Sequence, residues 1–350
     1  MEPITHFLTG ACMSRAGLNR KTGLATLTLV LAAEGPDIDA VSYFGGSING
    51  LQHHRGITHS FVGAPLIAAI TVGVVYGIYR LILKSGKQTR IPPNWALLYG
   101  YALLGSLSHI LLDFTNNYGV RPFAPFNLKW YSWDVNFIVE PVILAVLILG
   151  LVVPGLFSLV TEEIGARKAA FRGRGGAVFA LVCFAVVLFI RDFEHRKAVN
   201  ALKAVTYHDL DPIRVSAFPT SINPFVWNGV VETNDFFETT VVDSNAGEID
   251  PQHNATVRYK PEETPVTLAA KKSRLGRVFL DWAQYPVVEV ERLSSDRGYI
   301  VRFIDLRFNA MRFNSQRVNS SATGRRRSIL SGTVVLDSKL NVVDMYMGEK

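Results

Sequence analysis

Histidine and carboxylate side chains gather in a few short stretches near the start of this chain. Five of the eight histidines lie before position 110, and several Asp residues stand beside them. Imidazole and carboxylate ligands without thiolates suit zinc, and also manganese or iron, in an open catalytic site. These residues are more numerous than one metal ion needs. We therefore expect either two ions, or one ion whose ligands are oriented by hydrogen bonds from the other residues. The predicted metal ligands are His6, Asp37, Asp39, His54, His59, His109 and Asp113.

Three short motifs hold most of these ligands. The sequence PDID at residues 36–39 places two carboxylates two positions apart, after a proline that stops a helix. The sequence HRGITHS at 54–60 opens an apolar segment with two histidines and a glycine, and SHILLD at 108–113 places His and Asp on one helical face. Each motif alone is typical of a capped turn or helix end. Together, next to hydrocarbon where an unpaired ionisable group costs several kcal/mol, they predict a metal site.

Three further residues are predicted to take part in catalysis. Arg55 either binds a phosphate oxygen with its planar guanidinium or pairs with Asp37 or Asp39. Asp134 and Glu140 are candidates for the general base or for further metal ligands. Asp134 has a second interpretation, as an interfacial residue beside an aromatic belt at residues 130–133.

The part of the chain that carries these groups has a membrane-like composition. The whole chain is 49% apolar and 19% charged, whereas soluble domains have about 25% charged residues. Residues 1–190 hold 14 Lys and Arg and 9 Asp and Glu, whereas residues 191–350 hold 22 and 20. We therefore predict a multi-pass α-helical membrane domain at residues 1–193, followed by a soluble domain at 194–350. This division excludes a single globular enzyme, a disordered chain and a disulfide scaffold.

Four apolar stretches are predicted to cross a bilayer, which takes about 20 helical residues. These stretches are residues 60–83, 94–114, 137–160 and 177–190. A fifth stretch, 21–33, would span only if it extended to about residue 38, and residues 6–18 are expected to form an interfacial or half-inserted helix. Eleven basic residues lie in one set of connecting loops and three in the alternate set. This asymmetry places the candidate site and the C-terminal domain on the periplasmic side of a bacterial inner membrane.

Short alternating segments indicate an α+β domain, mainly antiparallel sheet, in the C-terminal part of the chain. Five of them are expected to form strands, at 225–233, 255–260, 287–293, 299–306 and 329–336. One helix is expected at 267–283. The basic run at 325–327 is interpreted as a solvated loop.

The order of the motifs resembles the YdjM-like family of bacterial inner-membrane proteins, which are described as metal-dependent hydrolases. The resemblance covers approximately positions 1–190, and HRGITHS is its most specific element. It implies a membrane-embedded helical hydrolase with His and Asp metal ligands. Glu140 departs from the family, which often has Asp before the proline. A fainter similarity to zinc-dependent phospholipase C favours a phosphoester substrate.

We therefore predict a membrane-embedded hydrolase that acts on a phosphoester or another membrane-associated substrate through a metal-activated water. A lipid or another amphiphile fits this location better than a soluble metabolite. The net charge of +7 divides into +5 and +2 over the two halves and flanks apolar segments, so no nucleic-acid partner is expected. Two alternatives remain: a non-catalytic membrane scaffold or regulator with a structural His/Asp cluster, and a transporter that uses the same groups as an ion path.

Overall fold

The computed structural model describes residues 1–86, 89, 91–163, 173–246, 255–293, 297–308 and 330–348. Within these residues the chain forms two compact units, and the main division falls after Glu194. Two short segments cross this division: Ala40–His54 belongs to the second unit and Pro219–Pro224 to the first. The basic residues expected at 87, 90, 167, 168 and 172, and the basic run 325–327, lie outside the described residues.

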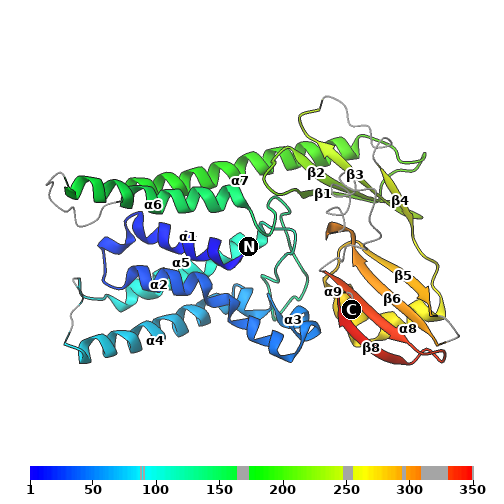
Figure 1. The fold of residues 1–350 in the computed structure, drawn as a ribbon, viewed down its shortest axis with the longest axis horizontal. Helices are drawn as coiled ribbons and strands as arrows, with labels where there is room; N and C mark the ends of the chain where they lie inside the picture. Colours follow the sequence, from blue (N-terminus) through cyan, green and yellow to red (C-terminus); the bar gives the residue numbers. More distant parts are fainter. Residues whose placement is uncertain are drawn as a thin grey trace. The chain divides into compact units, whose positions relative to one another are not determined.

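The first unit is a bundle of helices (Figure 1). Its helices are α1 (Pro3–Arg15), α2 (Ala25–Glu34), α4 (Gly63–Lys84), α5 (Trp95–Phe114), α6 (Pro141–Glu163) and α7 (Arg174–Lys203), whose last turns belong to the second unit. Among the described residues, three of them, α4, α5 and α7, are long and apolar enough to cross a membrane, and the apolar part Pro141–Pro154 of α6 is shorter. Unlike the interfacial helix expected at residues 6–18, α1 packs against α2, α5 and α6.

The fifth predicted span is wrong in length. Helix α2 has 10 residues, about 15 Å, and continues as a 3-10 helix at Gly35–Gly45 instead of extending straight to residue 38. The reason is Pro36, which has no N–H for continued α-helical bonding. The helix therefore ends inside the bundle and delivers the PDID motif there.

Two glycines allow α1 and α5 to approach α2 closely. A Cβ atom added to Gly10 of α1 would lie 2.8 Å from the Leu29 carbonyl oxygen, and one added to Gly105 of α5 would lie 2.9 Å from Ala32 Cβ. Small residues at such crossings let helix backbones meet in a membrane bundle. His6 lies one turn before Gly10 and His109 one turn after Gly105, so these crossings bring both histidines to the end of α2.

The second unit contains two four-stranded antiparallel sheets, each with its strands in sequence order (Figure 1). The first sheet comprises β1 (Arg214–Pro219), β2 (Val226–Glu232), β3 (Phe236–Asp243) and β4 (Thr256–Tyr259); the second comprises β5 (Pro286–Arg292), β6 (Tyr299–Asp305), β7 (Ser331–Leu336) and β8 (Val342–Met347). The predicted fold class, a helical membrane domain followed by a mainly antiparallel α+β domain, is confirmed. The sequence prediction missed β1, β3 and β8.

Helices α8 (Pro265–Lys272) and α9 (Arg274–Trp282) pack on the second sheet. The sequence predicted one helix here, but Ser273 adopts extended backbone angles and its side chain accepts a hydrogen bond from the Gly276 N–H, which starts a new helix. The short helix α3 (Ser47–His53) also belongs to this unit and packs against α9 and β8. Residues 40–54, which lie between two predicted ligand motifs, are thus part of the C-terminal unit.

Candidate metal centre

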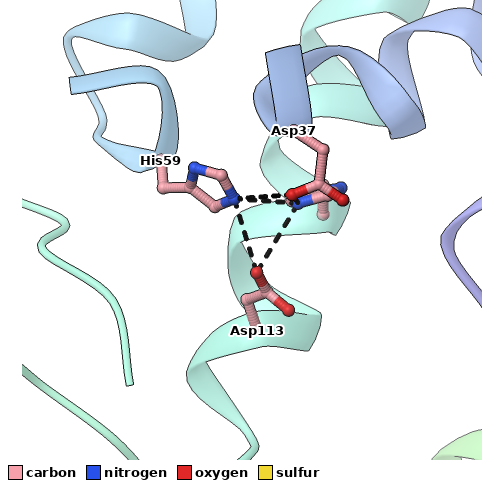
Figure 2. Close-up of side chains that lie close together, drawn as sticks. Asp37, His59 and Asp113 are labelled. Carbon is pink, nitrogen blue, oxygen red and sulfur yellow. Dashed lines mark hydrogen bonds and ion pairs between the residues drawn. The ribbon is translucent and has the colours of Figure 1, made fainter. Parts of the chain in front are cut away.

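Four of the predicted ligands come together within the first unit. Asp37 comes from the 3-10 helix after α2, His59 from a short 3-10 helix at Ile57–His59 before α4, and His109 and Asp113 from the last turns of α5. One nitrogen or oxygen atom of each of the four side chains lies within 4.8 Å of the others, and this group could hold a metal ion. Figure 2 shows Asp37, His59 and Asp113 pointing toward one another from these separate segments.

The separations between the facing atoms are those of metal ligands. His59 Nε2 lies 3.3 Å from Asp37 Oδ1 and 3.4 Å from Asp113 Oδ2. His109 Nε2 lies 3.5 Å and 3.6 Å from the same two oxygens. Two ligand atoms about 2.1 Å from a tetrahedral zinc ion lie roughly 3.4 Å apart. The group therefore has both the donor chemistry and the spacing that a zinc-sized ion needs.

In both His59 and His109, Nδ1 faces away from the four-residue group and Nε2 faces into it. The hydrogen bond of Nδ1 determines whether Nε2 carries a hydrogen. His109 Nδ1 lies 2.5 Å from the carbonyl oxygen of Ala33, and His59 Nδ1 lies 3.1 Å from Asp39 Oδ2. Each Nδ1 must carry a hydrogen in order to donate to its oxygen partner. In a neutral ring, Nε2 then has a lone pair and no hydrogen. The two Nε2 atoms are 3.1 Å apart. Two lone pairs at this distance repel each other unless a proton or a cation lies between them.

Asp39 supports the centre from outside. Its Oδ2 accepts hydrogen bonds from the Arg55 N–H at 2.9 Å, from Thr58 Oγ1 at 2.6 Å and from His59 Nδ1. This is the arrangement in which a carboxylate orients a metal-binding histidine and raises its basicity. The predicted ligand Asp39 thus lies behind His59, and Thr58 is a supporting residue that the sequence analysis did not identify.

His6 lies against the same group. Its ring is fully buried and stacks on that of His109, with ring centres 3.7 Å apart. Its Nε2 is 3.4 Å from Asp113 Oδ1, and neither ring nitrogen has a hydrogen-bond partner among the described residues. Burial lowers the pKa of His6 and keeps the ring neutral. A neutral buried histidine without a partner is available as a further ligand.

The guanidinium of Arg55 pairs with Asp113, while its backbone N–H donates to Asp39 of the PDID motif. The Arg55 guanidinium is buried, 3.0 Å from Asp113 Oδ1, and it also contacts Asn116 Oδ1 at 3.2 Å and the Gly119 carbonyl at 3.1 Å. The amino group of Met1 contacts Asp113 as well. Asp113 therefore offers Oδ1 to the Arg55 guanidinium while Oδ2 faces His59 and His109.

One acidic group near the end of α2 has a shifted pKa. Burial, together with the charge of Asp37, raises the pKa of Glu34 to about 7. Glu34 therefore carries a proton below neutral pH.

The remaining predicted site residues are not members of the four-residue group. His54 belongs to the second unit, where its ring contacts Tyr43. Glu140 is fully buried and forms an ion pair with Arg191, with Nη2 and Oε2 2.6 Å apart. Asp134 has a left-handed backbone conformation and joins no group of potential metal ligands among the described residues. Arg191 was not predicted because it lies well beyond the ligand motifs in sequence.

Comparisons with known proteins agree with the two-part structure. A family model described as YdjM inner membrane protein matches residues 1–198, and one described as YfhP C-terminal alpha/beta plait domain matches residues 265–317. The chain is 23% identical over 288 residues to a Bacillus subtilis (strain 168) protein whose printed name is uncharacterized protein YfhP. This match covers 81% of the chain and 76% of the relative. No solved structure matches.

Proposed function

Because this chain belongs to the YdjM inner membrane protein family, we propose that it is a membrane-embedded, metal-dependent hydrolase. Its His/Asp group takes a divalent cation, zinc first and manganese or iron as alternatives. The substrate is a phosphoester or another ester of a membrane-associated molecule. When bound, the ion supplies Lewis acidity, which polarises the bond to be cut and lowers the pKa of a water molecule.

The observation that carries the proposal is the pair of inward-facing Nε2 atoms 3.1 Å apart, with two carboxylate oxygens within 3.6 Å. Such a set is costly to bury without a cation, because lone pairs and negative charge face one another away from water. A divalent cation accounts for both orientations at once.

The protein's own residues then have separate tasks. Asp39 and the Ala33 carbonyl orient the two imidazoles, and Asp37 and Asp113 supply negative charge. Arg55 holds Asp113 and places a planar, permanently charged donor beside the group, where it serves to bind a phosphate oxygen. The proposal gives no role in the reaction to Glu140, because its carboxylate forms an ion pair with Arg191.

The arrangement of the chain supports the proposal that the site and the C-terminal domain lie on the same side of the membrane. Residues 40–54 lie between Asp39 and Arg55 and pack within the C-terminal unit, where Arg274 donates hydrogen bonds to Asn49 and Gln52, each at 3.2 Å. Segments that pack together lie on the same side of a bilayer. With the basic loops on the cytoplasmic side, this common side is the periplasm.

Metal content and hydrolysis together test the function. We expect protein purified in lipid nanodiscs to hold stoichiometric zinc, manganese or iron and to hydrolyse a phosphodiester lipid, with both properties lost on chelation. Protein that binds the ion but cleaves none of a panel of lipid esters and phosphoesters would overturn the hydrolase and favour a regulatory scaffold. Protein without stoichiometric metal would overturn the metal centre itself.

A further inference from the structure

A rigid apolar tip extends from the loop between α5 and α6. We define the tip as residues 123–129, which carry Phe123, Phe126 and Leu128. Phe126 is 87% exposed, Leu128 55% and Phe123 47%. Large apolar side chains grouped on one exposed loop mark a contact surface, whereas single exposed ones are ordinary.

The loop that carries the tip is held in place by hydrogen bonds and ring contacts, so the exposure of the tip does not come from a poorly ordered loop. Val120 and Tyr131 exchange two backbone hydrogen bonds of 2.8 and 2.9 Å across its base. Within the tip, the N–H groups of Phe126 and Asn127 both donate to the Phe123 carbonyl, at 3.0 and 3.1 Å. At the base, the Arg121 guanidinium lies 4.4 Å from the centre of the Trp130 ring. The fold therefore presents these apolar side chains outward and does not bury them.

The tip is attached to the ends of two membrane-spanning helices. The Phe61 N–H, two residues before α4 begins, donates to the Pro122 carbonyl at 2.9 Å, and the Phe61 and Phe123 rings are in contact with centres 5.7 Å apart. On the other side, the Trp133 N–H donates to the carbonyl of Phe114, the last residue of α5, at 2.7 Å. The tip therefore lies at the membrane boundary of α4, which begins four residues after His59, and of α5, which supplies Asp113.

The side chains around the tip are those of a membrane interface. Trp130 and Tyr131 follow it, and the Lys129 ammonium lies 5.9 Å from the centre of the Tyr131 ring. Aromatic rings with one polar edge and a lysine that can reach the headgroups are enriched where hydrocarbon meets water. This composition indicates a lipid leaflet as the partner and disfavours a soluble protein.

We propose that residues 123–129 insert into the leaflet bordering α4 and α5, with Phe126 and Leu128 among the upper acyl chains and Lys129 at the phosphates. The tip is an anchor in addition to the spanning helices, and it sets the depth of the candidate metal centre at the headgroup layer. The identity of the substrate rests in addition on the proposed function: it is a lipid headgroup ester that reaches the centre laterally, from within the membrane plane.

Depth-dependent fluorescence quenching tests the insertion without any need for activity. An environment-sensitive dye is attached to Cys in Phe126→Cys, on a Cys183→Ala background in which the remaining Cys12 is fully buried. Val74→Cys, from the middle of α4, is the deep reference, and Lys339→Cys, from an exposed turn of the second unit, is the aqueous reference. Nanodiscs contain lipids with a spin label either near the headgroup or near the chain end.

We expect the Phe126 label to be quenched mainly by the headgroup-proximal spin label, and the Val74 label mainly by the deep one. A Phe126 label that behaves like the Lys339 label, quenched by iodide and by neither lipid, would overturn the proposal. A Phe126 label protected from iodide and from both lipids would also overturn it, because a second protein copy would then cover the tip.

A double variant, Phe126→Ser/Leu128→Ser, tests the consequence for the substrate. Because both side chains are exposed, we expect unchanged metal content, and at least a roughly tenfold slower hydrolysis of vesicle lipid with no change for a short-chain soluble ester. Equal rates on vesicles would overturn the role in substrate access. If the unsubstituted protein cleaves neither substrate, the proposed function fails, and the quenching result still decides the insertion.

Discussion

Two buried sets of charged groups in the helical unit differ in a way that separates structure from function. Glu140 and Arg191 are both almost fully buried and neutralise each other at 2.6 Å. The group of Asp37, His59, His109 and Asp113 is also largely buried, but its facing atoms are four acceptors. Burial of ionisable residues alone therefore does not indicate a functional site. What distinguishes the second set is that one ligand atom from each of its four side chains lies within 4.8 Å of the others, so the group could hold a metal ion.

Among the variants considered, removal of one candidate ligand should have the largest effect on bound metal and activity. We expect His59→Ala to reduce bound metal well below stoichiometric and to abolish hydrolysis, because it removes one of the two imidazole donors of the group. Elemental analysis of purified protein measures the metal. His53→Ala, at an exposed histidine in α3, is the matched control and should retain both metal and activity.

Breaking the Glu140–Arg191 pair should instead affect stability. We expect Arg191→Met to lower the free energy of unfolding by about 3–5 kcal/mol, because it leaves a buried carboxylate uncompensated. Glu140→Leu/Arg191→Met should recover most of the loss, and folded molecules of both variants should keep their metal. Thermal unfolding in detergent gives the comparison. Loss of metal in the double variant would show that the two sets are coupled and would break the contrast.

Asp39→Asn tests the support behind a ligand. The amide retains the size of the carboxylate but loses the negative charge that orients and polarises His59, so we expect metal affinity to fall about 10–100-fold while the fold persists. Competition with a chelator of known affinity measures the change. An unchanged affinity would indicate that His59 does not bind metal through Nε2.

Glu34→Gln should have the smallest effect, visible only as a pH dependence of the metal-free protein. The pKa of Glu34 is raised to about 7 from an ordinary value of 4.5, so its contribution to stability is complete below about pH 4.5 and is lost as the pH rises through 7. At pH 8 the variant should be more stable by about 1 kcal/mol, since the half-exposed carboxyl keeps part of its hydration. Thermal unfolding at pH 8 and below pH 4.5 tests this sign; equal differences at both would contradict it.

Much of this structure could be predicted from the sequence because its signals are local. The helical spacing of His109 and Asp113 and the proline that ends α2 are readable over a few residues, as is the apolar length of α4 and α5. The strands with clear alternation, such as β2, were expected for the same reason. Strand β3 was missed because five consecutive residues from Phe236 are buried, which hides the alternation.

The contacts that could not be predicted are those between distant segments. Nothing near Arg55 indicates that its guanidinium pairs with Asp113, 58 positions later. Glu140 looked like a site residue because a lone acid before an apolar helix is costly, and its partner Arg191 lies on another helix. Side-chain type and spacing therefore identified which groups need partners, and tertiary packing decided which partners they have.

The packing of residues 40–54 has a consequence for how the protein is made. The ligands on both sides of this segment are translated early, whereas its partners, α9 and β8, come from residues 274–347, near the end of the chain. A nascent chain therefore carries all four ligands in the membrane before the surface that fixes the segment between them exists. The segment between Asp39 and Arg55 therefore reaches its packed position only after residues 274–347 have been synthesised and folded.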